Sequence, residues 1–182
     1  AGIGPGLSTG EAAEKELACV LTQAKIPLVL DADALNILSK HPDWLKKGDT
    51  PKILTPHMGE MVRLSGHSME ELKQKPLELA AAYAKEHEVI LVLKDARTVV
   101  TDGERIVLNT TGNNGMATGG SGDVLTGIIT GLLAQGMAPF EAAVSGVYLH
   151  GLAGDRAVEN TGVRGMLSTD LLKELPGVLK EG

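Results

Sequence analysis

The stretch 89-VILVLKDARTVVTDGERIVL-108 contains three short apolar runs, and their spacing decides what kind of sheet the chain can form. Residues 89–93 are an uninterrupted aliphatic run, which is typical of a strand buried on both faces of a parallel sheet. Residues 98–101 and 105–108 flank Asp102-Gly103, a dipeptide that favours a tight hairpin turn. The stretch therefore predicts one strand of parallel type followed by an antiparallel hairpin.

Outside this stretch, short aliphatic runs alternate with helical patterns. Residues 28–30 and 52–54 are predicted strands by the same criterion. Helical spacing of apolar residues predicts helices between and after the strands, including one over 77–87 and one over about 123–135. Strands that alternate with helices predict an α/β fold with a mostly parallel sheet covered on both faces.

The composition excludes several classes of protein. The chain of 182 residues carries 17 basic and 23 acidic residues, for a formal net charge of −6, and it has no dense lysine–arginine cluster that would bind nucleic acid. No apolar run approaches the roughly 18 residues that a membrane span needs, and no signal peptide is recognisable. Cys19, the single cysteine, excludes a disulfide framework and is expected to be buried and inert on a helix. These features favour a cytoplasmic protein.

The richest candidate site is 113-NNGMATGGSGD-123. Glycines let backbone N–H groups turn inward, and the N-terminus of the following helix adds a positive dipole, so the segment suits phosphate groups. The presence of Asp123 beside a predicted phosphate site needs a separate explanation, because a carboxylate repels phosphate. Asp123 either takes a proton from a substrate hydroxyl or caps the helix. Gly127 and Gly131, four residues apart in this helix, predict close packing against a neighbouring helix.

Two further polar segments follow expected strands, at the sheet edge where ligands bind in open α/β proteins. The carboxylates of 31-DAD-33 could hold Mg²⁺ through water, or Asp33 could simply cap the next helix. In 94-KDART-98, Lys94 and Arg97 could offer positive charge to phosphates, or the segment could be a solvated turn.

The segment 55-TPHMGE-60 also follows a strand. Thr55 and Pro56 are expected to begin a helix, with His57 and Glu60 on one face of its first turn. The alternative for Glu60 is a carboxylate favoured only by the helix dipole. His57 and Glu60 alone supply too few ligands for a metal site.

Taken in series, these motifs resemble one family. From Gly4 to about Gly154 the chain contains, in order, GPGL, DADALN, TPHMGE, the KDART stretch and GNNGMATGGSGDVLTGIITGLLAQG. It is similar to the ADP/ATP-dependent NAD(P)H-hydrate dehydratases of the ribokinase-like superfamily. The resemblance implies a three-layer α/β/α fold with a mostly parallel central sheet.

The resemblance also implies a reaction and its residues. Such enzymes dehydrate the S epimer of hydrated NADH or NADPH at the expense of ADP or ATP with Mg²⁺, by phosphorylating the ring hydroxyl and releasing phosphate. Asp123 would be the base. The nucleotide would contact Lys94, Asp95, Ala96, Arg97, Thr98, Asn113, Gly119, Gly120, Ser121 and Gly122; the hydrated coenzyme would contact Gly4, Gly6, His57 and Asp123. Mg²⁺ could lie near Asp31, Asp33 or Glu60.

The chain departs from the family pattern in two residues and in length. Met58 stands where the family commonly has proline, and Asp95 stands where it commonly has glycine, which puts a carboxylate beside the expected nucleotide site. The family's domain is longer, so residues 1–182 are expected to form a single ribokinase-like catalytic domain that lacks its N-terminal part. The family further implies a tetramer and a functional partner, NAD(P)H-hydrate epimerase, which can be fused upstream.

Two alternatives stay open. A small-molecule kinase of the same superfamily, acting on a vitamin precursor, would use the same loop and base but keep its phosphorylated product. A nucleotide-binding module without turnover would use the loop alone. The sequence does not distinguish ADP from ATP, or NADH hydrate from NADPH hydrate.

Overall fold

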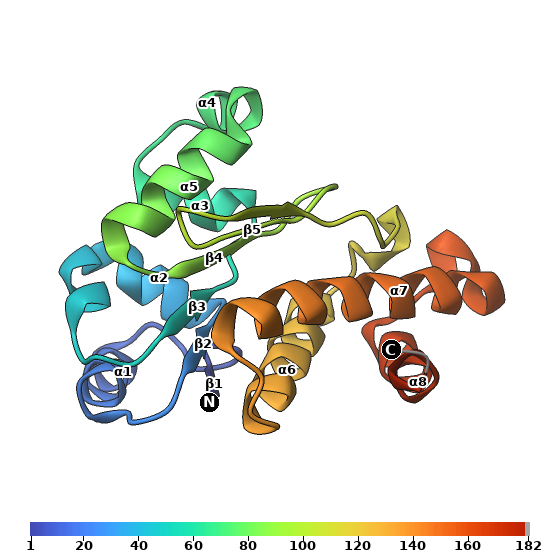
Figure 1. The fold of residues 1–182 in the computed structure, drawn as a ribbon, viewed down its shortest axis with the longest axis horizontal. Coiled ribbons are helices and arrows are strands. Elements are labelled where there is room, and N and C mark those ends of the chain that lie inside the picture. The colour runs from blue at the N-terminus through green and yellow to red at the C-terminus, as the bar shows by residue number, and fades with distance from the viewer. Residues whose placement is uncertain (181–182) are drawn as a thin grey trace.

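The computed structural model describes residues 1–180, which form a six-stranded sheet between two layers of helices (Figure 1). The four parallel strands are neighbours in chain order: β1 (Gly2–Ile3), β2 (Leu28–Leu30), β3 (Lys52–Leu54) and β4 (Ile90–Leu93). The antiparallel hairpin of β5 (Val99–Thr101) and β6 (Ile106–Leu108) extends the sheet beyond β4. The predicted strands and hairpin are therefore confirmed.

The helices divide into two sets along the chain. One face of the sheet is covered by α1 (Glu11–Gln23), α2 (Asp33–Lys40), the 3₁₀ helix η1 (Pro42–Lys46), α3 (Met58–Ser65), α4 (Met69–Gln74) and α5 (Pro76–His87). The other face carries α6 (Ser121–Ala134), α7 (Pro139–Gly165) and α8 (Ser168–Leu179), with the 3₁₀ helix η2 (Asn114–Met116) in the loop before α6. This is the expected three-layer α/β/α arrangement.

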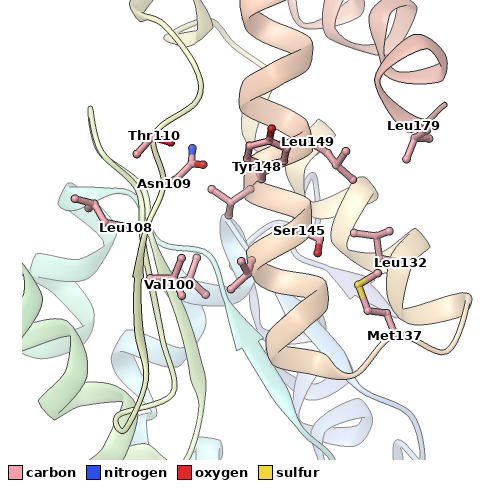
Figure 2. Close-up of a pocket in the computed structure, with 13 residues that line it drawn as sticks. Val100, Leu108, Asn109, Thr110, Leu132, Met137, Ser145, Tyr148, Leu149 and Leu179 are labelled. Carbon is pink, nitrogen blue, oxygen red and sulfur yellow. The ribbon is translucent and has the colours of Figure 1, made fainter. Parts of the chain in front are cut away.

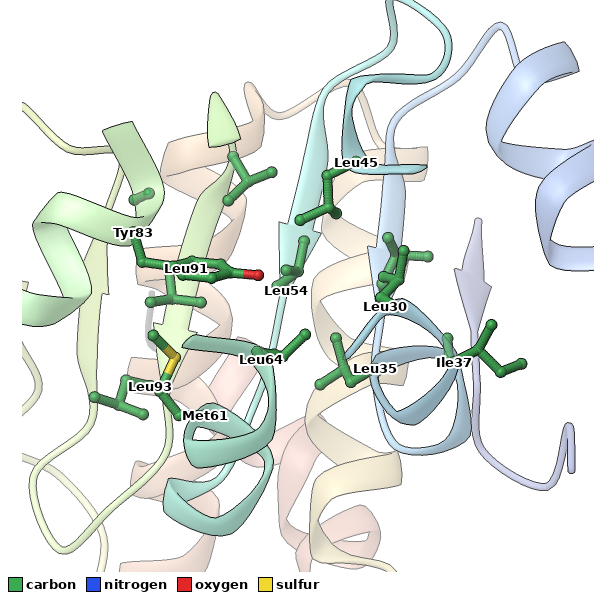
Figure 3. Close-up of a cluster of buried hydrophobic side chains, with 14 of the residues drawn as sticks. Leu30, Leu35, Ile37, Leu45, Leu54, Met61, Leu64, Tyr83, Leu91 and Leu93 are labelled. Carbon is green, nitrogen blue, oxygen red and sulfur yellow. The ribbon is translucent and has the colours of Figure 1, made fainter. Parts of the chain in front are cut away.

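The aliphatic strands hold both layers, because successive side chains of a strand point to opposite faces. Leu30, Leu54 and Leu91 come from three adjacent strands and pack together in the cluster beneath α1 to α5 (Figure 3). Val29 and Val92 belong to the second cluster, beneath α6 to α8. β2 (Leu28–Leu30) and β4 (Ile90–Leu93) are apolar at every position because both of their faces are covered.

The close approach of two helices depends on a glycine that the sequence reading did not single out. A Cβ on Gly146 of α7 would lie 2.5 Å from Cγ1 of Ile129 on α6. The prediction that Gly127 and Gly131 pack closely is wrong, since within the described residues no atom outside their own helix lies within 4 Å of a Cβ placed on either. These two glycines lie on a different side of α6 from Ile129.

The prediction of a buried cysteine is also wrong, because Cys19 is exposed on α1. The buried residues of α1 are Ala13, Leu17 and Leu21, which recur every four residues on one face. Cys19 lies two residues from Leu17 and from Leu21, which turns its side chain to the opposite side of the helix.

Candidate functional site

The turn after β1 lies against the end of β2. Gly4 has φ +129°, and a Cβ there would overlap the carbonyl oxygen of Asp31, so only glycine permits this approach. The Leu7 N–H donates to the Gly4 carbonyl at 3.0 Å, and the Ser8 N–H donates to Oδ2 of Asp33 at 2.8 Å. The predicted GPGL and DAD segments are therefore in direct contact.

The residue between the two aspartates has a strained backbone. Ala32 has φ +47° and ψ −118°, a combination that residues other than glycine rarely adopt. The carboxylate of Asp31 is buried, whereas that of Asp33 reaches Ser8 in the turn after β1. Asp33 does not cap α2, whose N-cap residue is Ala32. The alternative reading of Asp33 as a helix cap is therefore wrong.

Both carboxylate oxygens of Asp31 are engaged, and its side chain is only 2% exposed. Oδ1 accepts a hydrogen bond from Nζ of Lys94 at 2.9 Å, and Oδ2 accepts one from Oγ1 of Thr126 at 3.0 Å. Such partners are required, because a buried charge without them is costly to remove from water. Thr126 belongs to α6, so this bond joins the end of β2 to the opposite helix layer.

The N-terminus of α6 lies directly above this ion pair. Gly120 is its N-cap residue with φ +85°, and a Cβ on Gly122 would lie 3.2 Å from Nζ of Lys94. Asp123 is the third residue of the helix and is exposed, so it is not the N-cap. The first N–H groups of a helix lack intrahelical partners and carry its positive dipole. A candidate anion site and an exposed carboxylate are thus one residue apart.

The side chain of Ser121 turns inward, toward α7. Its Oγ lies 3.3 Å from Nε2 of His150, and both residues are buried. Burial is the main cause that lowers the pKa of His150 to about 4; a hydrogen bond with the Ser121 backbone opposes this shift, and the Lys94 charge adds to it. His150 is therefore neutral at pH 7 and joins the start of α6 to α7.

His57 lies beside Lys94 at the neighbouring strand end. The two residues form an isolated parallel β-bridge, and the Lys94 N–H donates to the Pro56 carbonyl at 2.8 Å. The prediction that Thr55 and Pro56 begin the helix is wrong. Both are buried at the end of β3, where Oγ1 of Thr55 donates to the Leu30 carbonyl at 3.4 Å.

His57 itself is the N-cap of α3, which begins at Met58. Nδ1 of His57 accepts hydrogen bonds from the N–H groups of Gly59 at 2.9 Å and Glu60 at 3.3 Å. Oε2 of Glu60 in turn accepts from the His57 N–H at 2.8 Å, which completes a capping box. With Nδ1 used as an acceptor, the neutral ring carries its proton on Nε2.

The predicted nucleotide stretch 94–98 leaves the end of β4 as a surface loop. Asp95, Ala96 and Arg97 are exposed and Thr98 is half-buried. The Thr98 carbonyl accepts a hydrogen bond from the Asn109 N–H at 2.9 Å. A backbone hydrogen bond therefore ties the end of this stretch to Asn109, where a second loop begins.

This second loop, residues 109–116, is held along α7 by Asp155. The carboxylate of Asp155 accepts from the Gly112 N–H at 2.8 Å and from Nδ2 of Asn113 at 3.0 Å. Oδ1 of Asn113 accepts from the Gly115 N–H at 3.0 Å. The Asn113 side chain therefore shapes the loop. Asp155 had no recognisable signal in the sequence.

The predicted residues differ in how closely they come together. Direct contacts join Gly4, Asp31, Lys94, His57 and Gly122, and Asp123 adjoins the last of these. Across residues 1–180, no group of three or more histidine, cysteine, aspartate and glutamate side chains could hold a metal ion. A magnesium ion near Asp31, Asp33 or Glu60 stays a prediction.

An apolar cavity of about 430 Å³ lies between the β5–β6 hairpin and α7 (Figure 2). Val100 and Val107 line it from the hairpin, Tyr148 lines it from α7, and Asn109 and Thr110 add polar atoms. These last two residues belong to the loop that Thr98 holds. The cavity is thus lined by the first two residues of the loop 109–116.

Three kinds of comparison place the chain among known proteins. A family model described as NAD(P)H-hydrate dehydratase matches residues 2–177. The bifunctional NAD(P)H-hydrate repair enzyme Nnr of Moorella thermoacetica is 49% identical over 180 residues, which are 98% of this chain and 34% of that protein. This chain therefore spans about a third of that relative's length.

Among the described residues 1–180, no helix is both long and apolar enough to cross a membrane.

Two solved structures match almost the whole chain. The ADP/ATP-dependent NAD(P)H-hydrate dehydratase of Bacillus subtilis, co-crystallised with ATP/Mg²⁺, superposes with a TM-score of 0.88 at 36% identity over 99% of this chain and 63% of that one. A ribokinase-like superfamily protein of Enterococcus faecalis superposes with a TM-score of 0.85 at 34% identity, over 99% of this chain and 62% of that one. The fold is therefore the ribokinase-like α/β fold.

Proposed function

Because this chain belongs to the NAD(P)H-hydrate dehydratase family, we propose that it dehydrates the S epimer of hydrated NADH or NADPH at the expense of ADP or ATP. One observation carries the proposal: exposed Asp123 follows Gly122, which lies against the Lys94 ammonium at the start of α6. A base beside an anion site suits the transfer of a phosphoryl group to a hydroxyl.

The proposed reaction has two steps. First, the Asp123 carboxylate takes the proton of the ring hydroxyl, whose oxygen attacks the terminal phosphorus of the nucleotide. The bond from that phosphorus to the bridging oxygen breaks, so that AMP leaves when ADP is the donor and ADP leaves when ATP is the donor. Second, the ring C–O bond breaks and phosphate leaves with the electron pair. A proton is lost from the neighbouring ring carbon, and the double bond of NAD(P)H is restored.

We assign the hydrated coenzyme to the space above Gly4, Gly6 and His57. No described atom lies within 4 Å of a Cβ placed on Gly6, so the turn leaves room for a ligand. The His57 side chain is more than half exposed, and its remaining donor, Nε2–H, lies 3.6 Å from Oε1 of Glu60. His57 would therefore offer a hydrogen bond to a carbonyl oxygen of the coenzyme.

We assign the nucleotide phosphates to the N-terminus of α6 and the nucleoside to the loop that follows Lys94. Asn113 and Ser121 have side chains engaged within the protein, so they would meet the nucleotide through their backbone N–H groups. The base would point toward the cavity beside Asn109. The remaining assigned residues are Asp95, Ala96, Arg97, Thr98, Gly119 and Gly120.

Mg²⁺ is proposed to arrive with the nucleotide. Both oxygens of Asp31 are engaged, Asp33 binds the Ser8 N–H and Glu60 completes a capping box, so these carboxylates do not form a ready cage for the ion. When bound to the phosphates, Mg²⁺ neutralises charge on them. We assign no step of the reaction to it.

The remaining parts of the proposal concern the setting of the enzyme. We propose that residues 1–182 act as one catalytic domain, that the protein is a cytoplasmic homotetramer, and that an NAD(P)H-hydrate epimerase supplies its S epimer. The free Cys19 is compatible with a reducing compartment. Light scattering of the purified chain tests the oligomeric state.

The deciding experiment mixes the protein with hydrated NADH, Mg²⁺ and either ADP or ATP, and follows the near-ultraviolet absorbance of the reduced nicotinamide. Nucleotide-dependent recovery of absorbance would support the proposal and identify the phosphoryl donor. A phosphorylated product that accumulates without recovery would indicate a kinase. If the nucleotide is bound but not consumed, the dehydratase proposal is wrong for this chain.

A further inference from the structure

A buried carboxylate lies beside the proposed phosphate site, where its charge would oppose phosphate binding. Oδ2 of Asp31 is 3.5 Å from the position of a Cβ on Gly122. The Lys94 ammonium is 3.2 Å from the same position and 2.9 Å from Oδ1 of Asp31. The carboxylate and the ammonium therefore lie together beneath the first turn of α6.

We propose that Asp31 is a positioning residue that holds the Lys94 ammonium beneath Gly122, so that this charge meets the phosphoryl group being transferred. The inference rests on the proposed function and extends it to a residue that touches neither substrate. Lys94 is the contacting group, and Asp31 acts through it.

Asp31 is suited to this role because its buried side chain is held by a second partner. Thr126 binds its second oxygen, and its carbonyl oxygen lies against Gly4. Lysine, by contrast, has a flexible side chain of four methylene groups, and its position must be set by a partner. The Lys94 side chain is 21% exposed, so its outer surface stays accessible to an anion.

The pairing also explains why a carboxylate is tolerated at this place. In the pair, the two charges cancel at a distance, and the ammonium is the member nearer to Gly122. Without Lys94, the Asp31 carboxylate would face the phosphates unneutralised. Removal of Asp31 should therefore harm the enzyme when Lys94 is present and help it when Lys94 is absent.

A double-mutant cycle tests this reversal of sign. The variants are Asp31→Asn, Lys94→Met and the double variant, each measured for the dissociation constant of ADP with Mg²⁺ by calorimetry and for kcat with hydrated NADH. Asp31→Asn alone is expected to lower kcat about tenfold or more with a smaller change in ADP affinity, since pre-organised charge acts mainly in the transition state. In the Lys94→Met background, Asp31→Asn is expected to restore ADP affinity at least threefold.

Thr126→Val gives a second, milder variant, because it removes one bond to Asp31 and keeps the side-chain shape. It is expected to lower kcat less than Asp31→Asn does, with ADP affinity retained. The matched control is the exposed pair of Lys85 and Glu104, 2.7 Å apart on the surface, changed to Met and Gln. Those changes should leave both readouts unaltered.

Two outcomes would overturn the inference. One is that Asp31→Asn leaves kcat and ADP affinity unchanged in a variant that circular dichroism shows to be folded. The other is that Asp31→Asn and Lys94→Met have multiplicative, independent effects on ADP affinity. If no variant, nor the unchanged chain, dehydrates hydrated NADH, the proposed function fails. The calorimetric cycle then still decides whether Asp31 acts through Lys94.

Discussion

Oγ of Ser121 lies 3.3 Å from Nε2 of His150, in a buried contact that joins the first residue of α6 to the middle of α7. The histidine is held neutral by its surroundings, because burial and the Lys94 charge both oppose a second proton on the ring. The contact that ties the start of α6 to α7 is therefore made by a neutral imidazole.

The protein should lose stability as the pH falls from about 6.5 to about 4. The pKa of His150 is about 4 in the folded state and has an ordinary value of 6.5, so the unfolded chain binds the proton first. The stabilisation that comes from neutral His150 is fully present above pH 6.5. About 3 kcal/mol of the free energy of unfolding is lost by pH 4. Urea unfolding at several pH values measures it. His150→Gln should flatten this part of the profile; an unchanged slope would assign the effect to other groups.

Asp123→Asn should separate catalysis from binding. Removal of a general base lowers turnover by about 10²–10⁴-fold, whereas ADP affinity should be kept or increased because a negative charge near the phosphates is removed. Turnover is read from recovery of reduced nicotinamide and affinity from calorimetry. Exposed Asp43 of η1 supplies the control, as Asp43→Asn should change neither. Full activity of the Asp123→Asn variant would contradict the proposed mechanism.

Gly4→Ala should destabilise the protein far more than Gly6→Ala. A methyl group on Gly4 would overlap the Asp31 carbonyl, and the loss is expected to be at least about 3 kcal/mol. A methyl group on Gly6 meets open space, so that only its left-handed backbone, with φ +70°, costs about 1–2 kcal/mol. Equilibrium unfolding of both variants measures the difference, and equal losses would mean that the turn does not lie against β2.

Ala32→Gly should increase stability, which is unusual for a change to glycine. The strained backbone of Ala32 costs on the order of 1–3 kcal/mol, and glycine removes that strain for an entropic cost of about 0.5–1 kcal/mol. Ala32→Val should have the opposite effect, because a branched side chain fits this conformation even less well. Thermal unfolding of the pair checks the expected order, Gly above Ala above Val.

Val107→Trp should weaken ADP binding if the base points toward the cavity. Val107 lines the cavity from the hairpin, and an indole there would occupy the space. Affinity for inorganic pyrophosphate, which has no base, should be unchanged. Competition calorimetry distinguishes the two ligands. Loss of both affinities, or of neither, would remove the cavity from the nucleotide site.

The strands, and the polar segments that meet at one edge of the sheet, could be predicted because their signals are local. Buried aliphatic runs, the Asp-Gly turn and the glycines before α6 each act within a few residues. Thr126 and Asp155 could not be found in this way. Thr126 stands among apolar residues of α6, and its partner Asp31 is 95 residues away in the chain. Local propensity also placed the start of α3 wrongly, at Thr55 and Pro56. The Thr55 hydroxyl instead donates to the Leu30 carbonyl, and His57 is the N-cap residue of the helix.

The ion pair beneath α6 has a consequence for biosynthesis. Asp31 is separated from Lys94 by 63 positions and from Thr126 by 95. At about 5–20 residues per second, a ribosome adds Thr126 about 5 to 19 seconds after Asp31. Throughout that interval the nascent chain holds a carboxylate that cannot yet be buried with its partners. Assembly of the candidate site therefore comes late, and a nascent chain that stalls before α6 is made has the strands but lacks the helix whose start lies over the Asp31–Lys94 pair.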